Sequence, residues 1–170
     1  MCYAVRPARA HEHDVLTQLC VRATRHLGYG DAFIDRVAPT LVVAPRSIMA
    51  GNVHVCAGEP DAVVGVVSIG PTIVEHARLP GSRRTRAIAM LGGIFVEPAL
   101  WRCGIGRLLF GAAVARARDR GAGALMIHAE PSAEGFYLRL GAVRIGEGPY
   151  GVSPDVVLPH LLYVVPRRVK

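Results

Sequence analysis

The sequence contains almost no lysine and no long apolar run. Lys170 is the only lysine, so the P-loop, in which a Gly-Lys-Ser/Thr sequence binds nucleotide phosphates, is excluded. No apolar stretch approaches the roughly 18 residues that a membrane helix needs. The first residues, MCYAVRPARAHEHD, do not combine a basic segment with an apolar one, as a secretory signal does. We therefore expect a soluble, cytoplasmic protein without a membrane partner.

Paired metal-binding cysteines are also missing. The four cysteines stand far apart, at positions 2, 20, 56 and 103, and the lack of any CxxC pair excludes a zinc knuckle. In a cytoplasmic chain they are expected to be free thiols. The His-Glu-His sequence at 11–13 resembles a metal pair only superficially, because alternate residues at a helix start point in different directions. We expect these residues to cap the helix or face solvent, and we expect no metal site.

The net charge of +7 comes almost entirely from arginine. Such a charge suits a polyanion such as nucleic acid, or it reflects a preference for arginine as the cation. The two short basic runs, 81–86 and 166–170, lack interleaved aromatic residues, and a solvated loop and tail explain them. We expect no nucleic-acid partner, whereas a smaller polyphosphate partner stays open.

Hydrophobic periodicity predicts alternating helices and strands in one domain, 1–170. The chain has 170 residues, 51% of them apolar and 19% charged, which is a globular composition. The predicted helices are 11–27, 31–40 with Asp31 as its cap, one that starts after the glycines near 105, and 131–140. The predicted strands are 3–7, 53–57, 62–69, 87–96, 124–129, 143–145 and 156–165, the last two joined through a Gly/Pro-rich segment, 146–154. The order β-α-α-β-β-β-α-β-α-β-β predicts an α/β domain with a mixed central sheet flanked by helices.

A pair of glycines stands between a predicted strand and a predicted helix, in the stretch FVEPALWRCGIGRLLFGAAVARARDRGA (95–122). A helix N-terminus presents backbone N–H groups without partners and a positive dipole, and glycine lets a phosphate approach them without meeting a Cβ atom. Arg102 and Arg107 add positive charge beside Gly104 and Gly106. The alternative is a plain tight turn. A dinucleotide fingerprint would need a third glycine where Leu109 stands.

A second glycine pattern, GEGPYG at 146–151, fits GxGxxG letter for letter. Prolines at 149 and 154 surround it and no helix is predicted after it, so we interpret it as a chance match.

The stretch VEPALWRCGIGRLL resembles the acetyl-CoA motif of the GCN5-related N-acetyltransferases (GNAT). Val96, Pro98, Gly104 and Gly106 match that motif, while Trp101 occupies the usual Gln/Arg position. Downstream, EPSAEGFYLRLGA (130–142) resembles the second cofactor element of the family, with Ser132 where asparagine is commoner. The order of the predicted elements also fits the GNAT fold, so the resemblance covers nearly the whole chain.

The resemblance implies an N-acetyltransferase that moves an acetyl group from acetyl-CoA to an amine. It implies that pyrophosphate lies on the N–H groups of the turn, and that the end of the strand before the turn splays from its parallel neighbour to pair with the pantetheine arm. Gly92 and Gly93 suit a bulge that helps this splay, or else close packing of a helix against the sheet. The implied cofactor-binding residues are Ile94, Phe95, Val96, Trp101, Arg102, Cys103, Gly104, Ile105, Gly106, Arg107, Ser132, Phe136 and Tyr137.

Tyr137 matches the general acid of the family, which would give a proton to the leaving thiolate. The alternative role is an apolar wall of the pantetheine channel. No base is assigned: Glu97 follows Val96 directly and can face outward, and His54 and His128 alternate with apolar residues as sheet histidines with satisfied hydrogen bonds do. A nucleophilic thiol at Cys103 is a further alternative, because a helix N-terminus can lower the pKa of a cysteine.

The acceptor is the least defined part of the prediction. In the family it usually meets the loop between the first two helices and the final hairpin, which places Tyr29, Asp31, Glu147 and Tyr150 where an amine cation would bind. We expect a small-molecule amine. Homodimers are common in the family, so a homodimer is possible. The alternative function is a sensor or regulatory domain that binds acetyl-CoA without turnover.

Overall fold

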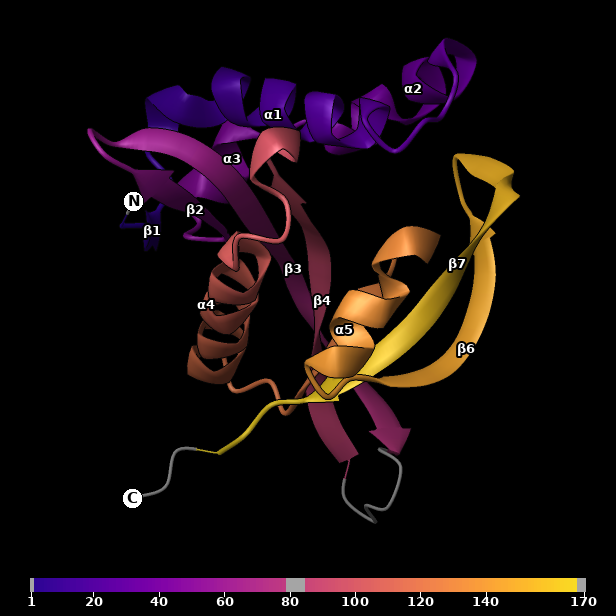
Figure 1. Cartoon of the computed structure of the whole chain (residues 1–170). Helices are drawn as coiled ribbons and strands as arrows, with labels where there is room; N and C mark the ends of the chain where they lie inside the picture. The colour runs from indigo at the N-terminus through magenta and orange to yellow at the C-terminus, as the bar shows by residue number, and fades with distance from the viewer. Residues whose placement is uncertain (1, 79–84, 168–170) are drawn as a thin grey trace. The chain divides into compact units, whose positions relative to one another are not determined.

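The computed structural model describes residues 2–78 and 85–167 (Figure 1). The helices are α1 (His13–Arg25), α2 (Asp31–Val37), α3 (Pro45–Met49), α4 (Ile105–Asp119) and α5 (Glu134–Arg139). The strands are β1 (Ala4–Pro7), β2 (Val53–Gly58), β3 (Ala62–Arg78), β4 (Thr85–Val96), β5 (Ala124–His128), β6 (Val143–Tyr150) and β7 (Ser153–Val164). The described strands form one sheet in the order β1-β2-β3-β4-β5-β7-β6, in which β4 and β5 run parallel.

The mixed α/β class with a central sheet is confirmed, and the predicted order of elements holds, with the short α3 added. By residue contacts the chain divides into two compact units, Met1–Ser68 with Gly93–Ala113 and Ile69–Gly92 with Val114–Lys170, which are called here the first unit and the second unit. Strands β3 and β4 and helix α4 contribute residues to both. The single-domain boundary, 1–170, stays a prediction.

The first unit is built on the antiparallel strands β1, β2 and the start of β3. On α1 the predicted helical spacing is correct for the inner face, because Leu16, Leu19 and Cys20 are buried, but Val15 is 44% exposed. Helix α2 starts at Asp31 with Gly30 as its N-cap, so Asp31 is the first helical residue and not the cap.

Gly65 on β3 sets how closely α4 approaches the sheet in the first unit. A Cβ atom at this position would lie 2.9 Å from Leu109 Cδ1, 3.1 Å from Ile105 Cγ2 and 3.1 Å from the backbone oxygen of Phe95. Leu109 and Ile105 are fully buried, so α4 is pressed against a strand that has no side chain at the contact. The first turn of α4 is thereby fixed against β3 and the end of β4.

Replacing Gly65 with alanine is expected to lower the free energy of unfolding by about 1–2 kcal/mol. Overpacking costs about 1–3 kcal/mol, which exceeds the roughly 0.4–1 kcal/mol gained from a stiffer unfolded chain. Gly111→Ala is the matched control, because this position of α4 has open space around the added Cβ and should gain about 0.5–1 kcal/mol in helix stability. Urea unfolding followed by circular dichroism measures both. Equal shifts for the two variants would contradict close packing at Gly65.

The second unit holds β5, β6, β7 and α5, with the adjoining parts of β3, β4 and α4. Its core includes Ile88, Ala124 and Leu162, against which Met126 packs. The parallel ladder between β4 and β5 pairs Ile88 with Ala124 through Leu91 with Ile127 and ends there. In the described chain no β4–β5 pair follows Leu91 with Ile127, and β5 itself ends at His128, so the splay that the resemblance implies stays a prediction.

The second-to-last strand corrects the sequence prediction. Residues 146–150 were expected to lie in a Gly/Pro-rich connection, but β6 continues to Tyr150 and β7 begins at Ser153. The sheet order places β6 at an edge, and Pro149 lies beside an irregularity of the β6–β7 ladder, two places where a strand tolerates proline. The GEGPYG sequence is thus largely strand, and its interpretation as a chance match holds because no helix follows it.

The His-Glu-His sequence has a structural role in the first unit. The carboxylate of Glu12 is buried, accepts the backbone N–H of Arg9 at 2.6 Å, and pairs with Arg6 at 2.7 and 3.0 Å. The capping prediction is correct for Glu12, and the Arg6 guanidinium holds the pKa of this carboxyl below its usual range. The four cysteines are free. In the described part of the chain, no helix has the length and apolarity needed to cross a membrane.

Candidate active site

The end of β4 leads into a short turn in the first unit. Strand β4 ends at Val96, the Glu97 N–H donates to the Val64 carbonyl on β3 at 2.9 Å, and a 3-10 turn follows at Pro98–Leu100. Two residues of the turn have left-handed backbones, Arg102 (φ 66°) and Gly104 (φ 84°). A Cβ built on Gly104 meets nothing within 4 Å, so the backbone is open on that side. The predicted glycine turn is therefore present and approachable.

Helix α4 starts directly at this open turn. The Gly104 carbonyl accepts the N–H groups of Arg107 (3.0 Å) and Leu108 (3.2 Å), which makes Gly104 the N-cap. Within residues 2–78 and 85–167, the N–H groups of Gly104, Ile105 and Gly106 donate to no backbone carbonyl. Three N–H groups without a backbone acceptor at the positive end of a helix of this length favour an anion with several oxygens.

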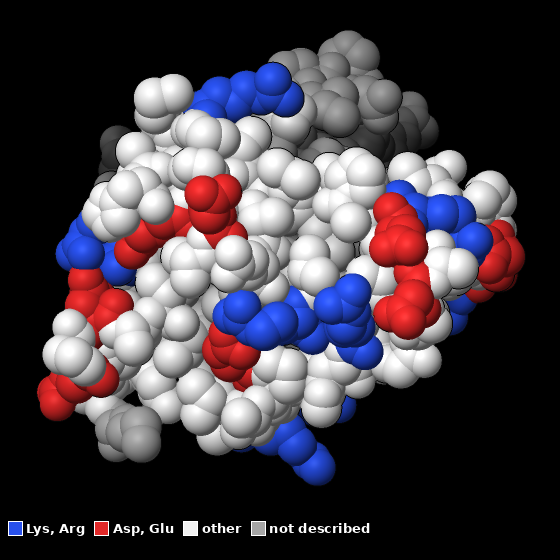
Figure 2. Space-filling view, turned by 90° about the horizontal axis from the view of Figure 1, so that it is seen from above, with Lys and Arg blue, Asp and Glu red and all other residues white. Residues whose placement is uncertain are grey.

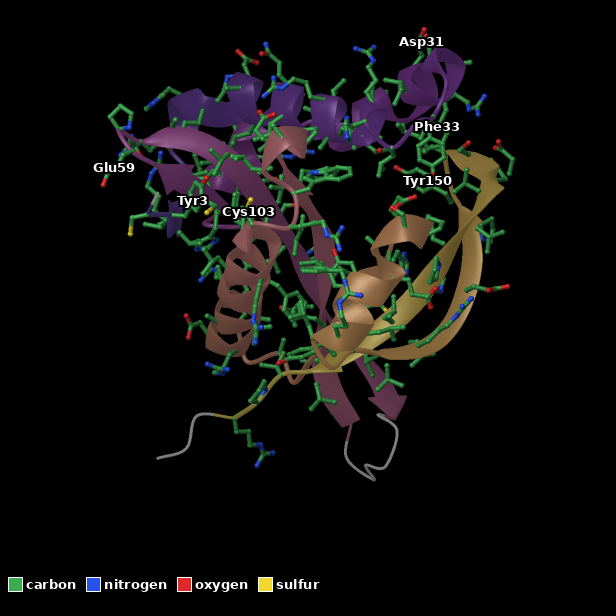
Figure 3. All side chains as sticks on the ribbon, viewed as in Figure 1. Tyr3, Asp31, Phe33, Glu59, Cys103 and Tyr150 are labelled. Carbon is green, nitrogen blue, oxygen red and sulfur yellow. The ribbon has the colours of Figure 1, made fainter. Side chains whose placement is uncertain are left out.

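The side chains around the turn are exposed. Arg102, Cys103 and Arg107 all face solvent, and Figure 3 shows Cys103 beside the first turn of α4. The Cys103 thiol donates a weak hydrogen bond to the Trp101 carbonyl at 3.7 Å. The two arginines can add charge to an anion site, whereas the contact of Cys103 is with its own turn.

Trp101 stands where the family motif usually has a Gln or Arg, and its indole still makes one polar contact. Its indole N–H donates to the carbonyl of Val96 at 2.9 Å, and its ring meets the His26 ring edge-on with centroids 4.9 Å apart. The indole thus closes the turn onto the end of β4. A carbonyl oxygen has two lone pairs, so Val96 retains one acceptor site for a ligand amide.

Glu97 is paired and not poised as a base. Its carboxylate forms an ion pair with Arg22, which stands one helical turn before His26 on α1. This long-range ion pair directs the carboxylate at helix α1. The sequence could not show it, since the partners are 75 residues apart.

The second unit carries the other predicted cofactor residues. The Ser132 N–H (2.8 Å) and its hydroxyl both donate to the carboxylate of Glu130, which caps the 3-10 turn Pro131–Ala133 before α5. Glu130 was missed as a functional neighbour of Ser132, although an acidic residue just before a helix start is a readable capping signal. The hydroxyl of Ser132 is therefore already engaged in a hydrogen bond within this turn.

Tyr137 lies on α5 and is buried, with 6% of its surface exposed. Its ring meets Phe136 edge-on at 5.0 Å, and its backbone carbonyl accepts the N–H groups of Leu140 and Ala142. Burial raises the pKa of the Tyr137 phenol above its usual value. The phenol therefore stays protonated through the whole neutral and mildly alkaline range, which both predicted roles allow.

A model of the acetyltransferase (GNAT) family matches residues 29–142. This range is most of the chain and includes the glycine turn and α5. The chain belongs to the acetyltransferase (GNAT) family. The predicted family is thus confirmed, and with it the prediction of an acetyltransferase. A comparison with curated proteins finds no match.

Solved structures of GNAT proteins share the fold. The chain resembles a GCN5-related N-acetyltransferase from Rhodopseudomonas palustris, with 17% identity, a TM-score of 0.71 and 96% of each chain covered. It resembles the PaiA N-acetyltransferase of Thermoplasma acidophilum in complex with coenzyme A, with 12% identity, a TM-score of 0.72, and 96% and 99% coverage. A GNAT acetyltransferase from Brucella melitensis in complex with acetyl-CoA gives 17% identity, a TM-score of 0.62, and 99% and 92% coverage.

The acceptor residues predicted for this GNAT chain divide between the units. In the first unit, Tyr29 stacks on Phe33 with centroids 4.1 Å apart, and the Asp31 side chain is 93% exposed, 4.0 Å from Arg25. Figure 3 shows Asp31 and Phe33 on α2. The structure thus brings Tyr29 and Asp31 to one end of α2, with an aromatic surface beside a carboxylate.

In the second unit, Glu147 and Tyr150 lie on β6, with Tyr150 at its end (Figure 3). The Glu147 carboxylate pairs with Arg144, which also contacts Glu134 of α5 at 3.2 Å. Glu147 thus already has a close cation partner, whereas the contact of Asp31 with Arg25 is longer, at 4.0 Å, which makes Glu147 the weaker cation site.

The GNAT chain shows interspersed charges on the face that Figure 2 presents. Basic residues form one short band at the centre of this face, and acidic residues lie beside this band and at several other places. The expectation of no nucleic-acid partner stays a prediction.

Proposed function

We propose that this chain transfers an acetyl group from acetyl-CoA to the amine of a small molecule. The observation that carries the proposal is the open, left-handed Gly104 at the start of α4, followed by a helix whose first N–H groups have no backbone acceptor among the described residues. The fold neighbours solved with coenzyme A and with acetyl-CoA support the choice of cofactor.

The residues of the turn fit the cofactor that the family implies. The N–H groups of Gly104, Ile105 and Gly106, with the guanidinium groups of Arg102 and Arg107, would hold the pyrophosphate. Ile94, Phe95 and Val96, together with Trp101 and the exposed Cys103, would line the pantetheine arm, and Ser132, Phe136 and Tyr137 would line it from α5. When bound, acetyl-CoA supplies an activated thioester carbonyl.

The chain would then have three chemical tasks. A backbone N–H at the end of β4 would polarise the thioester carbonyl. Tyr137 would donate its proton to the departing sulfur, because burial keeps the phenol protonated. The acceptor amine, with a pKa near 10, must lose a proton at a cost of roughly 4 kcal/mol at pH 7, so a base is needed.

An amine cation would be drawn to the exposed carboxylate of Asp31, with Tyr29 offering a ring face and Glu147 and Tyr150 a second polar surface. Replacing Asp31 with asparagine is expected to raise KM for the acceptor about 2- to 5-fold, the range of an exposed ion pair, without changing kcat. Glu147→Gln should have a smaller effect because Arg144 already pairs with it. An unchanged acceptor KM in both variants would remove these residues from the acceptor site.

The second candidate function, binding of acetyl-CoA without turnover, would follow if no proton acceptor serves the site. Incubation with acetyl-CoA and a panel of amines (spermidine, tyramine and lysine methyl ester) separates the two, with acetylated product detected by mass spectrometry. We expect product with at least one amine, and loss of that product in Tyr137→Phe. Binding of acetyl-CoA with no product from any amine would favour the sensor alternative. The predicted homodimer stays a prediction that sedimentation can test.

A further inference from the structure

Within the first unit, two side-chain contacts join the glycine turn to helix α1. The ring of Trp101 meets the ring of His26 edge-on, and the carboxylate of Glu97 forms an ion pair with Arg22. Arg22 and His26 stand four residues apart at the end of α1, so they lie on the same side of this helix. Figure 1 shows the turn after β4 beside α1. The turn is therefore held from outside as well as by its own backbone.

The held part of the turn precedes an unfavourable backbone conformation. Arg102 has a φ of 66°, in the left-handed region that residues with a Cβ atom rarely adopt. Such a conformation persists where the surrounding contacts fix the backbone. Trp101, the residue directly before it, is fixed twice, because its backbone N–H donates to the Pro98 carbonyl at 3.2 Å and its indole N–H donates to the Val96 carbonyl at 2.9 Å. The position of Trp101 therefore governs where the left-handed residue and the helix start that follow it are placed.

The indole of Trp101 has no polar group left for a phosphate. Its N–H is the only hydrogen-bonding group of the side chain, and the Val96 carbonyl accepts it. A Gln or Arg at this position, as in the family motif, would have several donors to offer an anion. Any contribution of Trp101 to an anion site must therefore be indirect, through the shape of the turn.

We propose that Trp101 is a positioning residue for acetyl-CoA, which holds the turn so that the N–H groups at the start of α4 can bind the pyrophosphate. Arg22 is the second anchor, because its ion pair holds Glu97, the first residue after β4, against α1. The inference rests on the proposed function, since it requires pyrophosphate at this turn. It adds to the lining of the pantetheine arm a role of Trp101 in phosphate affinity.

The test measures acetyl-CoA and inorganic pyrophosphate in the Trp101→Phe variant and the original protein. Phenylalanine keeps a ring for the contact with His26 and for the pantetheine arm, and it removes the indole N–H. We expect both Kd values to rise by the same factor, about 3- to 10-fold, which is the loss of one hydrogen bond, while kcat at saturating acetyl-CoA stays unchanged. Calorimetry measures acetyl-CoA, and the NMR signal of the Gly106 amide follows pyrophosphate.

A second variant, Arg22→Gln, loosens the other anchor and leaves Trp101 in place. We expect both Kd values to rise about 2- to 5-fold, the range of an exposed ion pair. Arg25→Gln is the matched control, because Arg25 is an exposed arginine of the same helix whose contact, 4.0 Å from Asp31, is with α2 and not with the turn. This control should leave both Kd values unchanged.

A loss of acetyl-CoA affinity alone in Trp101→Phe would mean that Trp101 contacts the pantetheine arm and does not shape the phosphate site. Unchanged Kd values in both Trp101→Phe and Arg22→Gln would mean that the turn keeps its shape without these contacts. Either result overturns the inference, as would an original protein that binds acetyl-CoA but not pyrophosphate. In those cases the proposed function stands, whereas an original protein that fails to bind acetyl-CoA would overturn the proposed function as well.

Discussion

Replacing Tyr137 with phenylalanine is expected to lower kcat about 100-fold and to leave the Kd for acetyl-CoA unchanged. The substitution removes one hydroxyl and keeps the buried ring, its contact with Phe136 and the backbone bonds that end α5. Because burial raises the pKa of the phenol, Tyr137 carries its proton at every pH of a usual assay. A change of pH therefore cannot restore the activity that the Tyr137→Phe variant loses. Release of free thiol and a calorimetric titration measure the two quantities.

Tyr163→Phe is the matched control for this change. Tyr163 pairs with Leu125 across the β5–β7 ladder and has no assigned chemical role. Its loss should leave kcat within about 2-fold. If Tyr137→Phe also left kcat within that range, Tyr137 would be a wall of the pantetheine channel, as the sequence left open.

Gly104→Val is expected to weaken acetyl-CoA binding by about 100-fold or more. An L-residue in a left-handed conformation costs about 1–2 kcal/mol, and a branched side chain would also fill the open space beside Gly104, which carries the first of the three N–H donors. Loss of charge-assisted hydrogen bonds worth about 1.5–3 kcal/mol each accounts for the affinity change. Calorimetric titration with acetyl-CoA measures the Kd.

The Gly121→Val variant separates the effect of backbone strain on acetyl-CoA affinity from the effect of a lost ligand contact. Gly121 also has a left-handed backbone (φ 76°) and open space around the built Cβ, but it lies after the end of α4, away from the turn. Both variants should lose a similar part of their unfolding free energy, while Gly121→Val keeps the affinity for acetyl-CoA. Similar losses of affinity in the two variants would mean that Gly104 acts through stability alone.

The local features of the site could be read from the sequence. A strand that ends at Val96, a glycine turn and a helix that starts at Ile105 each depend on residues within about ten positions, and they lie where they were predicted. The same is true of α5, which carries Tyr137. Backbone propensity and turn chemistry decide these elements, and both are local properties.

The pairings that define the chemistry could not be read in this way. Arg22 finds Glu97, and Trp101 meets His26, only after the strands and helices have assembled. Likewise, the sequence of β6, with its glycines and Pro149, is typical of a loop, and only its place at the sheet edge makes it a strand. Long-range register, and not residue type, decides which groups meet.

A thermal-shift titration with acetyl-CoA, with NAD and ATP as controls, tests the central claim most directly. At a hundredfold its Kd, a ligand stabilises the folded state by about 2.7 kcal/mol, which for a chain of this size is roughly 5–10 °C in Tm. The proposed phosphate site at Gly104 predicts that shift with acetyl-CoA and its loss in Gly104→Val. No shift at millimolar acetyl-CoA would make the glycine pair a plain turn and would contradict the proposed acetyltransferase.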